Sequence, residues 1–135
     1  MSSLPTDLFR YNTAATSFRI AFYNCSDLTA IPSGLFYYNA AAIDFRNTFN
    51  GCDKAQLAID IFYPVGSAVT RFLNKSVDFY FCFYRTAFTG TQGTAPDLWN
   101  VNFGTGTPVT TRAYYGEGNS LTSLTNFADI PVGWQ

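Results

Sequence analysis

The sequence contains no histidine, which removes the commonest catalytic and metal-binding chemistry. Ser-His-Asp triads and Cys-His pairs both need an imidazole base, so neither can form. Three cysteines without a histidine also argue against a zinc site, because four ligands are the rule. Nine carboxylates could supply an acid–base pair as in glycosidases, but turn and capping roles explain most of the aspartates better. We therefore expect a protein that is not an enzyme and that holds no cofactor or metal.

Charged residues are equally scarce. They make up only 13% of the chain, about half the ~25% typical of globular domains, and the formal net charge is −1. The eight basic residues are scattered, so the sequence has no basic stripe of the kind that binds nucleic acid. We expect no nucleic-acid partner.

Long apolar runs, phosphate-binding loops and a secretory leader are also missing. The densest apolar stretch, 77–84, is interrupted by Asp78 and is far shorter than the ~20 residues of a membrane span, so we expect no membrane insertion. The glycine-rich stretches "TGTQGTAPD" (89–97) and "GTGTP" (104–108) lack the Gly-Lys-Ser/Thr ending of a phosphate loop. The first residues, "MSSLPTDLFRYN", have neither the basic nor the apolar region of a signal peptide.

Aromatic residues, by contrast, are in excess, with fourteen Phe and nine Tyr among 135 residues. A chain of this length suits one domain with a sizeable core. So many aromatic rings cannot all be hidden in so small a body, and we expect some of them at an interface.

The clearest pattern is an internal repeat. "LPTDLFRYNTAATSFRIAFYNC" (4–25) matches "IPSGLFYYNAAAIDFRNTFNGC" (31–52) at a constant offset of 27 residues, since position 4 falls on position 31. A third match needs a gap, after which "VDFYFCF" (77–83) resumes the pattern of "IDFRNTF" (43–49), and a fourth, around "TTRAY" (110–114), is weaker. The pattern predicts one repeat domain over residues 1–135, with units at 4–30, 31–56, 57–94 and 95–129 and an insertion at about 64–72.

A fixed period of 20–50 residues is typical of stacked repeats, in which neighbouring units bury an apolar face that one unit cannot shelter. Within a unit, "LTAI" (28–31) and "QLAI" (56–59) predict short strands, and "FRNTFNGC" (45–52) predicts a helical turn with Gly51 as its C-cap. The predicted fold class is a leucine-rich-repeat-like solenoid of about four coils of roughly 26–37 residues, with short parallel strands joined by short helical or irregular turns.

In such a stack, equivalent residues lie one above another, about 4.8 Å apart. Two inner rows of phenylalanine are therefore expected as the structural core: Phe18, Phe45 and Phe79 in one, and Phe22, Phe49 and Phe83 in the other. We also expect Asn12 over Asn39 to form a side-chain hydrogen-bond ladder.

One segment resembles a known family. "AFYNCSDLTAIPSGLF" (21–36) is similar to the leucine-rich repeats of the BspA type, found in bacterial surface proteins and in some phage and prophage proteins. The family pattern is a Phe-x-x-Cys turn, a Leu-Thr-x-Leu/Ile strand and a proline, and its residues here are Phe22, Cys25, Leu28, Thr29, Ile31 and Pro32, with Phe49, Cys52, Leu57 and Ile59 in the next unit. The resemblance covers about 4–62 well and the last third poorly. It implies a non-enzymatic surface for adhesion or protein contact.

Several side chains are candidates for an interaction surface. The tyrosines fall near turns or alternate with inner phenylalanines, and Tyr is enriched where proteins meet partners. They are Tyr11, Tyr37, Tyr38, Tyr63, Tyr80 and Tyr84. The alternative is that they pack sideways within the coil. Arg19 and Arg46, with Arg112 continuing the row, form either a ligand-facing basic strip or a solvated edge paired with Asp44.

Cys25 and Cys52 share a repeat position, so they are either close enough for a disulfide or two small buried apolar residues. Cys82 falls at another phase of the repeat. Neither end of the repeat resembles a polar cap, which predicts that another chain, a second copy or more of a larger polypeptide covers the ends.

The function that follows is a non-enzymatic interaction or adhesion module acting through its aromatic-rich surface, on a cell surface or a virion. The alternative is a phage structural protein, a capsid decoration or tail component that uses the repeat as an assembly block. The expected partner is protein, either a second copy or a larger assembly. Carbohydrate binding, the third hypothesis, depends only on the aromatic and Asn content, and Tyr38→Ala would test it.

Overall fold

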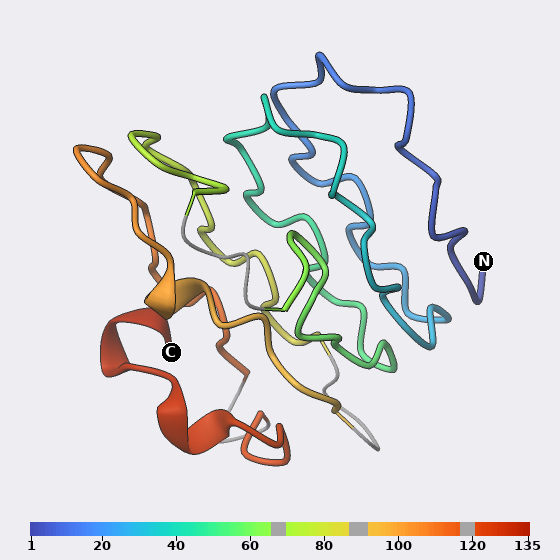
Figure 1. Cartoon of the computed structure of the whole chain (residues 1–135). Coiled ribbons are helices and arrows are strands. Elements are labelled where there is room, and N and C mark those ends of the chain that lie inside the picture. Colours follow the sequence, from blue (N-terminus) through green and yellow to red (C-terminus); the bar gives the residue numbers. More distant parts are fainter. Residues whose placement is uncertain (66–69, 87–91, 117–120) are drawn as a thin grey trace.

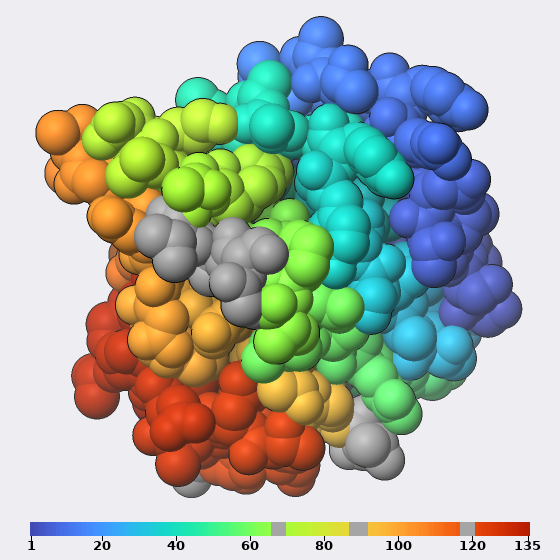
Figure 2. Space-filling model, in the orientation of Figure 1, coloured from blue at the N-terminus to red at the C-terminus, as the bar shows by residue number. Residues whose placement is uncertain are grey.

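The computed structural model describes residues 1–65, 70–86, 92–116 and 121–135. Parts of the predicted insertion (64–72) and of the glycine-rich stretch 89–97 therefore lie outside the described residues. The chain runs as successive loops that lie side by side in sequence order (Figure 1). The same order is visible on the surface, where layers follow one another from the N-terminal to the C-terminal end (Figure 2).

Regular secondary structure is sparse. The helices of the described residues are three 3-10 helices, η1 (Leu98–Asn100), η3 (Phe127–Asp129) and η4 (Val132–Trp134). Extended backbone is limited to isolated parallel β-bridges that join Ser17 to Asp44, Ala30 to Gln56, Asp44 to Asp78, Leu57 to Gly93 and Asp78 to Val109.

The predicted fold class is therefore wrong. Across the described ranges there is no β-sheet and no α-helix, so the chain is not a strand-rich repeat solenoid of the leucine-rich-repeat kind, and most of it is irregular. The predicted strand 28–31 contributes one bridge residue, Ala30, and 56–59 contributes two, Gln56 and Leu57, while the predicted helical turn at 45–52 is a series of tight turns. Gly51 does adopt a left-handed backbone, with φ 79°, but no helix precedes it.

The irregular backbone is explained by four equivalent segments, 17–24, 44–51, 78–85 and 109–116. We call them the turn ladder. At every second residue of one segment the backbone N–H donates to a carbonyl of the next segment. The first set runs from Phe18, Ile20, Phe22 and Asn24 to Asp44, Arg46, Thr48 and Asn50. Two further sets of four repeat this between the later segments, all with N···O distances of 2.7–3.2 Å.

The intervening peptide groups bond within their own segment. The N–H of Ala21 donates to the carbonyl of Phe18, and the N–H of Tyr23 donates to that of Ile20. Such turns require a left-handed backbone at fixed places. Two such positions recur, with φ between 50° and 79°: Ile20, Asn47, Phe81 and Arg112 at the first, and Asn24, Gly51 and Arg85 at the second. Neither a strand nor a helix contains these conformations, so segment 44–51 forms tight turns in place of the helical turn predicted at 45–52.

The ladder places the phenylalanines in rows. Phe18, Phe45 and Phe79 follow one another with ring centres 6.0 and 5.7 Å apart. Phe22, Phe49 and Phe83 do the same at 5.3 and 5.5 Å, and Tyr114 extends this row at 5.3 Å. A third row, not predicted, consists of Phe9, Phe36 and Phe62. All but Phe9 are buried.

The two outer faces of the ladder differ. At the first segment, the carbonyls of Ser17, Arg19, Ala21 and Tyr23 accept no hydrogen bond from any described residue. At the last segment, Trp134 packs 5.9 Å from Phe79, and its carbonyl accepts the N–H of Tyr114. Residues 130–134, which follow the last predicted unit, therefore cover the last segment of the ladder.

Buried polar side chains bond backbone carbonyls between layers. The Asn39 amide donates to the carbonyls of Phe9 and Asn12 at 3.0 and 2.9 Å. The predicted ladder of Asn side chains is therefore not formed, because Asn39 bonds the backbone of the earlier layer. Arg71 in turn donates to the carbonyl of Asn39 at 2.8 Å, and burial lowers the pKa of its guanidinium to about 10.

The central position of Phe45 makes a direct test of the core. Phe45 is fully buried among Phe18, Phe36, Phe62 and other rings. We expect Phe45→Ala to reduce the free energy of unfolding by ~3–5 kcal/mol, because it leaves a cavity that neighbouring layers cannot fill. Urea denaturation followed by circular dichroism measures this. Tyr11→Ala, at a side chain that is 89% exposed, should change it by less than ~0.5 kcal/mol. A Phe45→Ala protein as stable as the wild type would contradict the assignment.

Ile20 gives a second test, because a β-branched residue is strained in the left-handed region where its φ is 53°. Asn47 occupies the equivalent position one segment later and tolerates this backbone. We expect Ile20→Asn to increase the free energy of unfolding by ~1 kcal/mol, since the Ile20 side chain is 57% exposed and loses little burial. Ile43→Asn, at a position that is not left-handed, is the matched control and should not stabilise. Equal effects at both positions would contradict the turn ladder.

Candidate interaction surface

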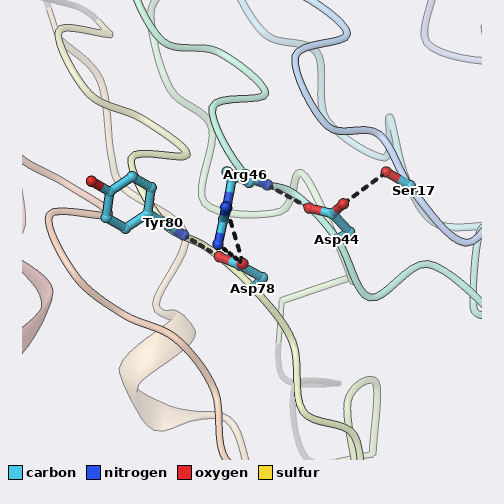
Figure 3. A network of polar contacts seen from close by, with 5 residues as sticks. All are labelled: Ser17, Asp44, Arg46, Asp78 and Tyr80. Carbon is cyan, nitrogen blue, oxygen red and sulfur yellow. Dashed lines mark hydrogen bonds and ion pairs between the residues drawn. The ribbon is translucent and has the colours of Figure 1, made fainter.

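One edge of the ladder carries a polar network (Figure 3). Asp44 and Asp78 occupy equivalent positions, and each accepts the backbone N–H two residues further along its own segment. Each also accepts a side chain of the preceding segment: Ser17 donates to Asp44 at 3.1 Å, and Arg46 donates to Asp78 at 3.1 and 2.8 Å. The two carboxylates therefore fix a turn and join two layers, which is a structural use of the acidic side chains.

The arginines do not form the predicted row. The Arg46 guanidinium pairs with Asp78, one layer further on, whereas Asp44 accepts the Arg46 backbone N–H. Arg112 does not continue the row of Arg19 and Arg46, because it lies at the left-handed position of Phe81. Arg19 is exposed at the outermost layer.

Beside this network lies a continuous group of aromatic rings and guanidinium groups, which we call the aromatic–arginine face. It contains Arg46, Tyr80, Phe81, Tyr84, Arg112 and Tyr115. Ring centres of Tyr80 and Phe81 are 4.2 Å apart, those of Phe81 and Tyr84 4.8 Å, and those of Tyr84 and Tyr115 5.8 Å. The Arg46 guanidinium carbon lies 5.2 Å from the Tyr80 ring centre, and that of Arg112 lies 4.9 Å from Tyr115 and 5.7 Å from Phe81.

The other predicted tyrosines are dispersed. Tyr11 and Tyr38 are exposed near Arg10, whose guanidinium carbon is 5.9 and 5.6 Å from their ring centres. Tyr37 is half-buried and donates to Asp60 at 3.3 Å. Tyr63 is buried and donates to Asp97 at 3.0 Å, so it takes no part in the surface, and its burial, with the nearby Asp97 carboxylate, raises the pKa of its hydroxyl.

Of the predicted surface residues, Arg46, Tyr80 and Tyr84 therefore come together, while Arg19, Tyr11, Tyr37, Tyr38 and Tyr63 lie elsewhere. Phe81, Arg112 and Tyr115 complete the face and were not predicted as its members. The register of "TTRAY" (110–114) on the pattern of 79–83 places Arg112 opposite Phe81, and this was the available signal.

The cysteines are free thiols, so Cys25 and Cys52 are not bridged. The Cys52 thiol donates to the carbonyl of Phe22 at 3.0 Å, and Thr86, at the equivalent position, donates to that of Phe49 at 2.7 Å. This position thus supplies a hydrogen bond between layers. Burial raises the pKa of Cys52 to about 12 and that of Cys82 well above its ordinary value.

Within the ranges that the structure describes, no three thiol or carboxylate side chains are close enough to share a metal ion. None of the helices in those ranges has the length and apolar character that a membrane crossing needs. Comparison with known protein families gives no match, and searches among characterised proteins and among solved structures find no similar chain. The resemblance to BspA-type repeats therefore stays a prediction.

The buried thiols predict a stability that falls at alkaline pH. A thiol ionises near its ordinary pKa of 9.0 in the unfolded chain, whereas Cys52 stays protonated up to about pH 12 in the folded protein. The unfolded state therefore loses protons first, and the free energy of unfolding decreases from about pH 9 upward, by up to ~1.4 kcal/mol per pH unit for each such thiol. Urea midpoints at pH 8, 9.5 and 10.5 measure this. Cys52→Ala should flatten the pH dependence, and an unchanged slope in that variant would contradict the assignment.

Proposed function

We propose that this protein is a non-enzymatic interaction module that binds a protein partner through the aromatic–arginine face. The single observation that carries this proposal is the continuous set of four half-buried rings and two arginines on one edge of the ladder. Tyr, aromatic residues in general and Arg are the residue types that contribute most to binding at protein interfaces.

The backbone supports the same proposal. Phe81 keeps a left-handed conformation, with φ 53°, although it is a bulky residue. At the equivalent position of the preceding segment stands Asn47, a residue that tolerates this conformation well. Strain of ~1–3 kcal/mol at one residue is frequent at functional positions, and in this chain Ile20, outside the face, has the same backbone conformation. The proposed reason is the half-exposed ring that Phe81 contributes to the face.

Arg112 gives the aromatic–arginine face an exposed positive charge. Its guanidinium lies over Phe81 and Tyr115, is exposed, and is paired with no carboxylate among the described residues. Such an arginine, already held flat by rings, is suited to a carboxylate of a partner. The proposed partner is a second copy of the chain or another subunit of a larger assembly, on a virion or a cell surface.

Self-association tests this proposal first. We expect the sedimentation coefficient to rise with concentration between about 10 µM and 1 mM, and the double variant Arg112→Ala, Tyr115→Ala to weaken the association about tenfold or more. Arg19→Ala is the matched control, because Arg19 is also exposed but contacts no ring of the face. A double variant that associates like the wild type would overturn it, and a protein that stays monomeric throughout would exclude a second copy as the partner.

A further inference from the structure

A polar hollow of about 390 Å³ lies on the same side of the ladder, at the layers of the first three segments. Its walls include Tyr23 and Tyr84, and the amides of Asn24 and Asn50 and the ion pair of Asp53 with Arg85 also line it. The side chains of the aromatic–arginine face other than Tyr84 take no part in it.

The hollow exists because one residue of a tyrosine row is missing. The equivalent positions of the four ladder segments hold Tyr23, Asn50, Tyr84 and Tyr115. The short Asn50 side chain donates to the Asn47 side chain at 2.8 Å, and so leaves open the space that a ring would occupy. The next residue, Gly51, adds no side chain, and a Cβ there would lie only 2.2 Å from the amide oxygen of Asn24.

The dimensions favour a puckered ring over a flat one. Tyr23 and Tyr84 are carried by backbones two layers apart, which at the usual spacing of hydrogen-bonded backbones is at least about 9.6 Å, and phenylalanine rings of neighbouring layers are 5.3–6.0 Å apart. A ligand in van der Waals contact with a ring on each side uses about 7–8 Å of this distance. At least about 2 Å remains for the thickness of the ligand itself, which is more than a planar group needs and suits a ring with axial and equatorial substituents.

The polar groups favour a neutral ligand rich in hydroxyls. Asp53 and Arg85 pair at 3.6 Å, so this pair adds no net charge to the lining, and their side chains remain about one-third exposed, at 31% and 36%. The two Asn amides offer donors and acceptors side by side. The Asp53 carboxylate can accept from one hydroxyl, and the Arg85 guanidinium can donate to the neighbouring one. Few well-placed polar groups against aromatic walls are typical of small-ligand sites.

We infer that this hollow binds a pyranose ring of a neutral saccharide, held between Tyr23 and Tyr84 and hydrogen-bonded by Asn24, Asn50, Asp53 and Arg85. This inference goes beyond the proposed function, because it concerns a small ligand and a set of residues that shares only Tyr84 with the aromatic–arginine face. It also differs from the carbohydrate hypothesis drawn from the sequence, since Tyr38 lies near Arg10 and does not line the hollow.

The test is a glycan array of neutral mono- and oligosaccharides, followed by titration of the saccharide that binds, observed by NMR. Asn50→Tyr restores the row of tyrosines and fills the hollow, so binding should be lost by about tenfold or more while the protein stays folded. Tyr23→Ala removes one wall and should weaken binding to a similar degree. Tyr38→Ala is the matched control and should leave the affinity within about twofold, because Tyr38 is 51% exposed like Tyr23 but does not line the hollow.

The outcomes separate this inference from the proposed function. Loss in Asn50→Tyr and Tyr23→Ala, with retention in Tyr38→Ala, supports the saccharide site. Absence of binding to every neutral saccharide on the array, or binding that a folded Asn50→Tyr protein retains, overturns it. Denaturant midpoints show whether each variant is folded. Self-association of the wild type should persist in Asn50→Tyr, so failure at one site is distinguishable from failure at the other.

Discussion

The structure depends on how each ladder segment divides its peptide groups. Alternate N–H groups bond to the next segment, and those between them close turns within the segment itself. This division satisfies the backbone in the middle of the stack without a sheet or a helix, which a buried chain must do in some way. It also keeps equivalent residues one above another, and the phenylalanine rows follow from that alignment.

The surface ion pairs contribute much less than this backbone arrangement. Twelve hydrogen bonds of one kind join the four segments, and each typically contributes ~0.5–1.5 kcal/mol. The half-exposed pair of Arg46 with Asp78 belongs to a class worth ~0–1 kcal/mol. The main role of the Asp44 and Asp78 carboxylates is therefore to fix the backbone conformation. They fix the start of a turn in each layer, and so set which residues fall at the left-handed positions that follow.

The sequence predicts how many residues separate equivalent positions of successive layers. It does not predict the backbone conformation within each layer. The alignment that puts Phe18 on Phe45 and Phe22 on Phe49 depends on buried residues, whose identity packing restricts, and those rings do stack. The left-handed positions hold Ile, Asn, Phe and Arg in turn, so no residue type marks them, and the segments were taken for strands and a helical turn.

The unpredicted backbone conformation also explains the errors about the surface. Residue type suggested that Arg112 continues the row of Arg19 and Arg46, but the backbone places it opposite Phe81. Tyr63 looked like a surface tyrosine, and only the fold shows that its hydroxyl reaches a buried position beside Asp97. The hollow was not predicted from the sequence either, because it results from the short Asn50 side chain at a position where the other ladder segments have tyrosine.

The unpaired carbonyls of Ser17, Arg19, Ala21 and Tyr23 give the molecule a direction. Acceptors cannot satisfy acceptors, so two copies facing each other at this end would set like dipoles together and form no backbone bond. Two copies therefore cannot continue the backbone ladder symmetrically at this end, whereas a chain that presents amide hydrogens at alternate residues can extend it.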